Sequence, residues 1–88
     1  MDFSIIDRGG VTQGQFAKLV GVSRITVNTW VKGHFQPRPV VRHRVSTALR
    51  LIAKAIEAGS LPAVTMRRTE ATDLVLNRIR TAVESAEA

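Results

Sequence analysis

Hydrophobic side chains recur at helical spacing in the segment that follows the first dozen residues. Phe16, Leu19 and Val20 share one face of a helix that the spacing predicts over 13–20. Thr12 comes directly before this segment, and its hydroxyl can accept a hydrogen bond from an amide of the first turn. The pattern therefore predicts a short amphipathic helix with Thr12 as its N-cap.

A second short helix is predicted over 24–32, with Ser23 as its N-cap. Val27, Trp30 and Val31 carry the apolar spacing of this segment. Gly21 stands between the two segments, where it can take a positive φ and has no side chain to hold the helices apart. These features are typical of two helices that cross steeply over a turn of three or four residues.

The flanking sequence predicts three more helices, over 2–8, 39–58 and from Thr69 or Thr72 to about 85. The short apolar run at 63–66 does not support a strand assignment. We therefore expect an all-α fold, a small bundle of about five helices in one compact domain. Its parts are a core, a connector and a C-terminal helix, over 1–59, 60–68 and 69–88.

The helix pair resembles the helix-turn-helix of the phage lambda repressor and Cro family. The matching residues are Gln13, Ala17, Gly21, Val27 and Trp30, with the apolar Phe16, Val20 and Val22 and the W-x-x-G-x-x-x-P run over 30–37. The resemblance implies a DNA-binding domain in which the helix over 24–32 is the recognition helix. It also implies that Gln13 contacts a phosphate and braces that helix; the alternative is a solvated glutamine in the first turn.

The outward face of the 24–32 helix has the residue types that read base edges in a major groove. Arginine can bind guanine O6 and N7, asparagine can pair with adenine N6 and N7, and apolar groups can contact a thymine methyl. The candidate base-reading residues are Ser23, Arg24, Ile25, Asn28 and Thr29.

Charge strengthens this interpretation, because the net charge of +6 is unevenly distributed. No acidic residue occurs between Asp7 and Glu57. Nine basic against two acidic residues give +7 for 1–56, whereas four basic against five acidic residues give −1 for 57–88. A basic stretch alone is often simply solvated, but next to the helix pair it indicates a phosphate-binding surface.

The candidate phosphate-contacting residues, beside Gln13, are Lys32, His34, Arg38, Arg42, His43 and Arg44. Cations near the start of the 39–58 helix oppose its dipole, and a bound phosphate would relieve that conflict. The alternative is a solvated basic face. Phe35 stands between these cations, close to two prolines, and we expect it to fill the core; the alternative is a group that stacks on a base.

The last helix has a broad apolar arc. Its predicted central stripe is Ala71, Val75, Ile79, Ala82 and Ala86. One part of the arc can cover the core, and the rest needs a partner. The predicted dimer interface is Leu74, Val75, Leu76, Ile79, Ala82 and Val83.

Several classes of function find no support in the sequence. The absence of cysteine excludes disulfides and thiolate metal sites and suits a reducing cytoplasm. Neither His34 nor His43 has a metal-ligating partner at useful spacing, and no catalytic motif is present. We expect no metal, cofactor, small-molecule substrate, signal peptide or membrane span.

The sequence thus predicts a cytoplasmic, nucleoid-associated transcriptional regulator that binds double-stranded DNA sequence-specifically. It would be a phage-type or bacterial repressor that acts as a homodimer on a palindromic operator. The alternative is an antitoxin-like protein whose last helix binds a partner protein, with DNA binding secondary. Nonspecific RNA or DNA binding rests on charge alone, and an aromatic content of 5% is low for a stacking platform.

Overall fold

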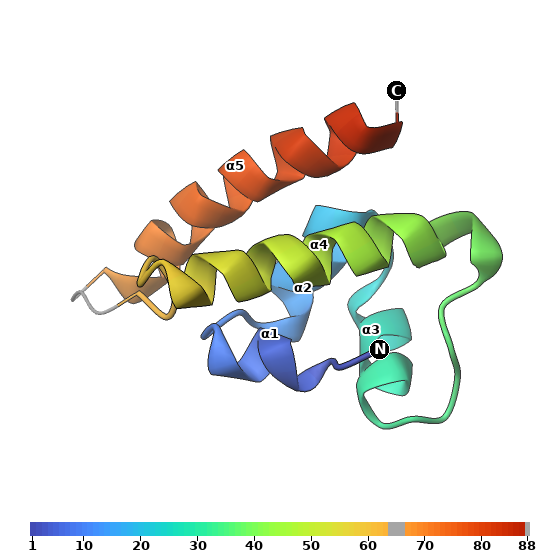
Figure 1. Ribbon diagram of the computed structural model, residues 1–88. Coiled ribbons are helices and arrows are strands. Elements are labelled where there is room, and N and C mark those ends of the chain that lie inside the picture. The colour runs from blue at the N-terminus through green and yellow to red at the C-terminus, as the bar shows by residue number, and fades with distance from the viewer. Residues whose placement is uncertain (64–66, 88) are drawn as a thin grey trace.

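A computed structural model describes residues 1–63 and 67–87 and shows helices without strands in those ranges. The helices are α1 (Ser4–Arg8), α2 (Gln13–Val20), α3 (Arg24–Val31), α4 (Pro39–Glu57) and α5 (Arg68–Glu87) (Figure 1). The all-α prediction is confirmed, while most of the run at 63–66 lies outside the described residues. No helix in the described part is long and apolar enough to cross a membrane.

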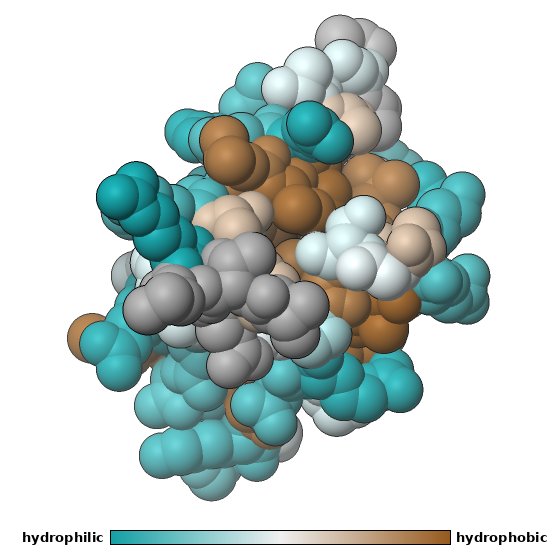
Figure 2. Space-filling model, turned by 90° about the vertical axis from the view of Figure 1, so that its left-hand side faces the viewer, coloured by the Kyte–Doolittle hydropathy of each residue, from teal (hydrophilic) through white to brown (hydrophobic). Residues whose placement is uncertain are grey.

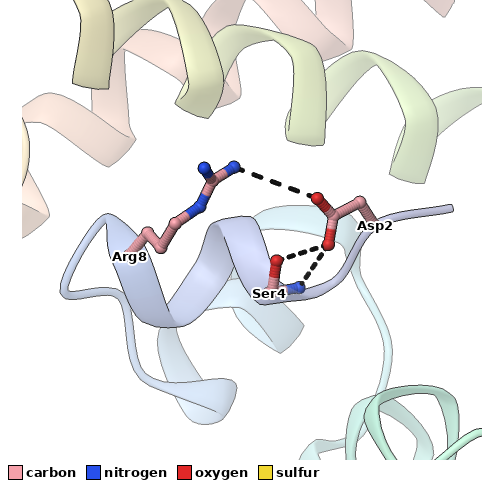
Figure 3. Close-up of polar contacts among 3 residues, drawn as sticks. All are labelled: Asp2, Ser4 and Arg8. Carbon is pink, nitrogen blue, oxygen red and sulfur yellow. Dashed lines mark hydrogen bonds and ion pairs between the residues drawn. The ribbon is translucent and has the colours of Figure 1, made fainter.

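The first helix begins with a cluster of polar contacts (Figure 3). The hydroxyl and the backbone N–H of Ser4 donate to the Asp2 carboxylate, and Arg8 lies 3.9 Å from its other oxygen. The Ser4 hydrogen bonds hold the pKa of Asp2 below its ordinary value. The carboxylate therefore stabilises the fold above that ordinary pKa, and the contribution is lost as the pH falls towards the folded-state pKa.

The predicted start and end of α2 are confirmed. Thr12 Oγ1 accepts from the Gln15 amide at 3.0 Å, and Gln15 Oε1 accepts from the Thr12 amide at 2.9 Å. This reciprocal pair is a capping box. At the other end, Gly21 takes a φ of 75° and donates to the Ala17 carbonyl at 2.8 Å. Because the turn is this tight, α3 starts only four residues after α2 ends.

The core lies where α4 meets the helices on either side of it. In Figure 1, α4 runs through the middle of the molecule, with α5 on one side and α1 and α3 on the other, while α2 packs against both α4 and α5. Fully buried side chains come from four of these helices: Phe16 and Val20 of α2, Val27 of α3, Val45 and Ile52 of α4, and Thr72 and Val83 of α5. The predicted stripe of α4 is confirmed at Val45, Leu49 and Ile52, and it becomes half-buried towards both ends of the helix.

The buried face of α5 differs from the predicted one. The buried row is Thr72, Leu76, Ile79 and Val83, whereas Ala82 of the predicted stripe is exposed and Val75 is half-buried. The apolar pattern was misleading because a threonine occupies one position of the row. Thr72 Oγ1 has no hydrogen-bond partner among the described residues. With this face, α5 packs on α2 and α4. At the surface, a hydrogen bond joins α2 to α5, because Gln15 Nε2 donates to Asp73 Oδ1 at 2.9 Å.

The packing of α5 leads to a matched pair of variants. Ile79→Ala truncates a buried side chain and should lower the free energy of unfolding by about 2–5 kcal/mol. Leu74→Ala, on the same helix but 65% exposed, should change it by no more than about 0.5 kcal/mol. Urea unfolding of both variants measures the difference. Equally small losses would mean that α5 does not belong to the cooperative core.

Candidate nucleic-acid interface

The two faces of α3 divide as the sequence predicts at Val27 and Trp30, but Val31, predicted beside them, has an exposed fraction of 42%. Val27 and Trp30 are buried, and the Trp30 ring lies 5.9 Å from that of Phe3. On the outer side Arg24 is exposed, and Ile25 has an exposed fraction of 77%. Because the inner face is locked into the core, the outer face is held in a fixed position.

The hydroxyls of α3 are engaged within the helix itself. Ser23 Oγ accepts from the Thr26 amide at 3.1 Å and lies 2.8 Å from Thr26 Oγ1. Thr29 Oγ1 donates to the Thr26 carbonyl at 2.6 Å. Asn28 and Thr29 are half-buried rather than fully exposed. Of the five predicted base-reading residues, the cap residue Ser23, Arg24 and Ile25 are therefore the most accessible.

Arg24 reaches back across the start of α2. A Cβ added at Gly14 would lie 4.0 Å from Arg24 Cδ and 3.8 Å from Thr12 Oγ1. These residues and the half-buried Gln13 line a hollow of about 450 Å³. The first amides of a helix have no intrahelical acceptor, so this end of α2 carries partial positive charge beside the guanidinium of Arg24. Sequence reasoning missed Gly14, although a glycine inside a helical pattern can mark a packing or functional site.

The loop over 32–38 presents several of the predicted phosphate-contacting residues. Lys32, His34 and Arg38 are exposed, as are Arg42 and His43 in the first two turns of α4. Gly33 takes a φ of 76° just after α3, as its predicted position beyond the helix end requires. The structure thus brings these cations onto the surface next to the end of α3.

Phe35 was expected in the core, and that prediction is wrong. Its exposed fraction is 68%, and Pro37 is the residue of the loop that is fully buried. Phe35 therefore remains at the surface among the exposed cations.

Arg44 differs from the other predicted phosphate-contacting residues. It is half-buried, and its Nη1 donates to the carbonyl of Val20 at 3.0 Å. Val20 is the last residue of α2, whose final carbonyls carry partial negative charge and favour a cation. Arg44 thus joins α4 to the end of α2, so its guanidinium is already engaged in the fold.

Three of the six residues of the predicted dimer interface are buried in the core of the same chain. Leu76, Ile79 and Val83 are buried against the rest of the domain, so this fold does not offer them to a second copy. Leu74, Val75 and Ala82 remain accessible to different extents. Figure 2 shows hydrophobic side chains gathered at the centre of the face on which α4 ends and α5 begins in Figure 1.

Comparison with known proteins adds no assignment. No protein-family model matches the chain, and the searches of curated proteins and of solved structures find no match either. Among the described residues, no group of three or more histidine, cysteine or acidic side chains is placed to hold a metal ion.

The position of Arg44 gives a test that needs no ligand. Arg44→Ala removes a hydrogen bond from a charged donor and leaves the Val20 carbonyl without it, so stability should fall by roughly 1.5–3 kcal/mol. Arg42→Ala removes an exposed cation from the same helix and should cost no more than about 0.5 kcal/mol. Urea unfolding without DNA separates the two. If Arg44→Ala were as stable as wild type, the bond to Val20 would not hold α4 in place.

Proposed function

We propose that α2 and α3 form a helix-turn-helix and that α3 enters the major groove of double-stranded DNA. The observation that carries this proposal is the division of α3 into two faces. Its inner face is anchored by buried Val27 and Trp30, while its outer face presents Arg24 and Ile25 with Asn28 one turn further on. A fixed helix with an accessible arginine, asparagine and aliphatic group suits direct readout of base edges.

The charge distribution supports the same orientation. Residues 8–56, which include all of α2 and α3 and most of α4, contain no acid. Exposed Lys32, Arg38 and Arg42 stand beside the end of α3 and the start of α4. Acidic side chains gather instead on α5, which lies on the opposite side of α4 from α3 (Figure 1). A polyanion is therefore attracted to the α3 side of the molecule.

Two further contacts follow from this orientation. One phosphate would bind at the start of α2, where the free first-turn amides lie beside Gln13. Another would bind at the start of α4, where cations otherwise oppose the helix dipole. Arg44 contributes to this surface by holding α4 against α2, rather than by contacting phosphate itself.

The proposal extends to a transcriptional repressor that occupies a palindromic operator as a homodimer. A two-fold site would let two copies place their α3 helices in successive major grooves. On α5, the accessible Leu74, with Val75 and Ala82, is the surface left for the second copy. The same exposed leucine favours the second candidate, in which α5 binds a foreign protein and DNA binding is secondary.

Selection of bound sites from random duplex DNA tests the proposal. Wild type should recover a two-fold symmetric consensus, and sedimentation with a recovered duplex should give two copies per site. Arg24→Ala should weaken binding to the preferred site by roughly 1–3 kcal/mol and relax the preference at one or two positions. Asn28→Ala should act in the same way at a neighbouring position, because it removes a different base contact.

Binding to random duplexes is the control for these variants. Asn28→Ala should leave it nearly unchanged, and Arg24→Ala should weaken it by no more than the loss of one positive charge. Failure of wild type to enrich any sequence would contradict sequence-specific recognition. Enrichment with base preferences that both variants keep intact would show that α3 is not the reading element.

A further inference from the structure

We propose that Phe35 contacts the DNA directly, as an apolar anchor that packs against the sugars beside the groove. The inference rests on the proposed function and deepens it, because it adds a contact that neither base readout nor phosphate charge supplies. It assigns a role to the aromatic residue that the sequence pattern had placed in the core.

The loop holds Phe35 at the surface through contacts on both sides. On one side, the His34 amide donates to the Thr29 carbonyl at 3.0 Å, which ties the loop to the last turn of α3. On the other side, Pro37 is fully buried. The exposed ring thus stands on a segment that is fixed within two residues in each direction. A side chain displayed in this way can bind without the cost of ordering a free loop.

A hollow of about 710 Å³ lies next to Phe35, between α3, the loop and the start of α4. Most of its lining is apolar and includes Val22, Trp30 and Val41. Val40, on the edge of the same hollow, has an exposed fraction of 87%. Phe35 and Val40 thus expose apolar surface to water next to the proposed recognition helix. A ligand that covers this surface removes it from water, which favours binding.

The charges around this apolar surface decide which ligand fits. Arg38 lines the hollow, exposed Lys32 and His34 precede Phe35, and no acid occurs anywhere from residue 8 to residue 56. The complementary partner must combine dense negative charge with apolar faces. Duplex DNA does so, because phosphates alternate with deoxyribose rings and thymine methyl groups along each strand.

A sugar contact has a signature of its own. Phosphate contacts change the dependence of affinity on salt, and base contacts change sequence preference. Packing against sugars should change neither, since sugars carry no charge and occur at every position. Phe35→Ala should therefore weaken binding roughly tenfold to the selected site and to random duplexes alike. Its slope of log affinity against log salt should equal that of wild type.

Two control variants make the comparison specific. Arg38→Ala should make the salt slope shallower by about 0.9, because one phosphate contact is lost. Phe35→Leu keeps an apolar side chain and should recover most of the lost affinity. The thermal melt of Phe35→Ala should match that of wild type, because the side chain is exposed in the free protein.

The possible results distinguish a failure of the Phe35 contact from a failure of the proposed DNA binding. If wild type binds DNA and Phe35→Ala binds as tightly, the inference is overturned and the apolar hollow is left to a peptide or protein partner. A changed salt slope, a change confined to one base position or a clearly lower melting temperature in Phe35→Ala would also overturn it. If wild type itself binds no duplex DNA, the proposed function fails before Phe35 is tested.

Discussion

The close crossing of α2 and α3 is the constraint on which the rest of the structure depends. Gly21 makes it possible by taking a φ of 75°, which side chains with a Cβ rarely adopt. A Cβ there would lie 3.1 Å from Arg44 Nη1, the same nitrogen that donates to the carbonyl of Val20. The turn is thus held from outside by α4. Phe16, Val20 and Val27 are fully buried as a result, and the direction of α3 is set.

The same arrangement explains how a small domain keeps a surface rich in cations. A chain of 88 residues has a modest core, so each covering element matters. Here α5 covers α2 and α4 with Leu76, Ile79 and Val83, and it brings acidic residues to the side of α4 opposite α3. Several cations of residues 8–56, among them Lys32, Arg38 and Arg42, are exposed at the end of α3 and the start of α4. The polyanionic ligand that we propose would supply opposite charge for them.

Local chemistry was predictable from the sequence, and tertiary placement was less so. Thr12 and Ser23 cap α2 and α3 as expected, because a cap depends on residues within one turn. The buried face of α5 was misassigned, because buried Thr72 interrupts the apolar row. Phe35 was misjudged for a different reason, because its residue type suggested burial while Pro37 is the fully buried residue of the loop. The hydrogen bond from Arg44 to the carbonyl of Val20 joins two helices and could not be predicted from the local sequence.

Chemical-shift mapping of the backbone amides during titration with a short DNA duplex tests the central claim most directly, because it reports the contacted face residue by residue. We predict shifts that cluster in the first turn of α2, in α3, in the loop over 32–38 and in the first turn of α4. The outer face of α5 should remain unperturbed at the same protein concentration, apart from changes around Leu74 if two copies assemble on the duplex. Shifts confined to α5, with α3 and the loop unchanged, would contradict the account.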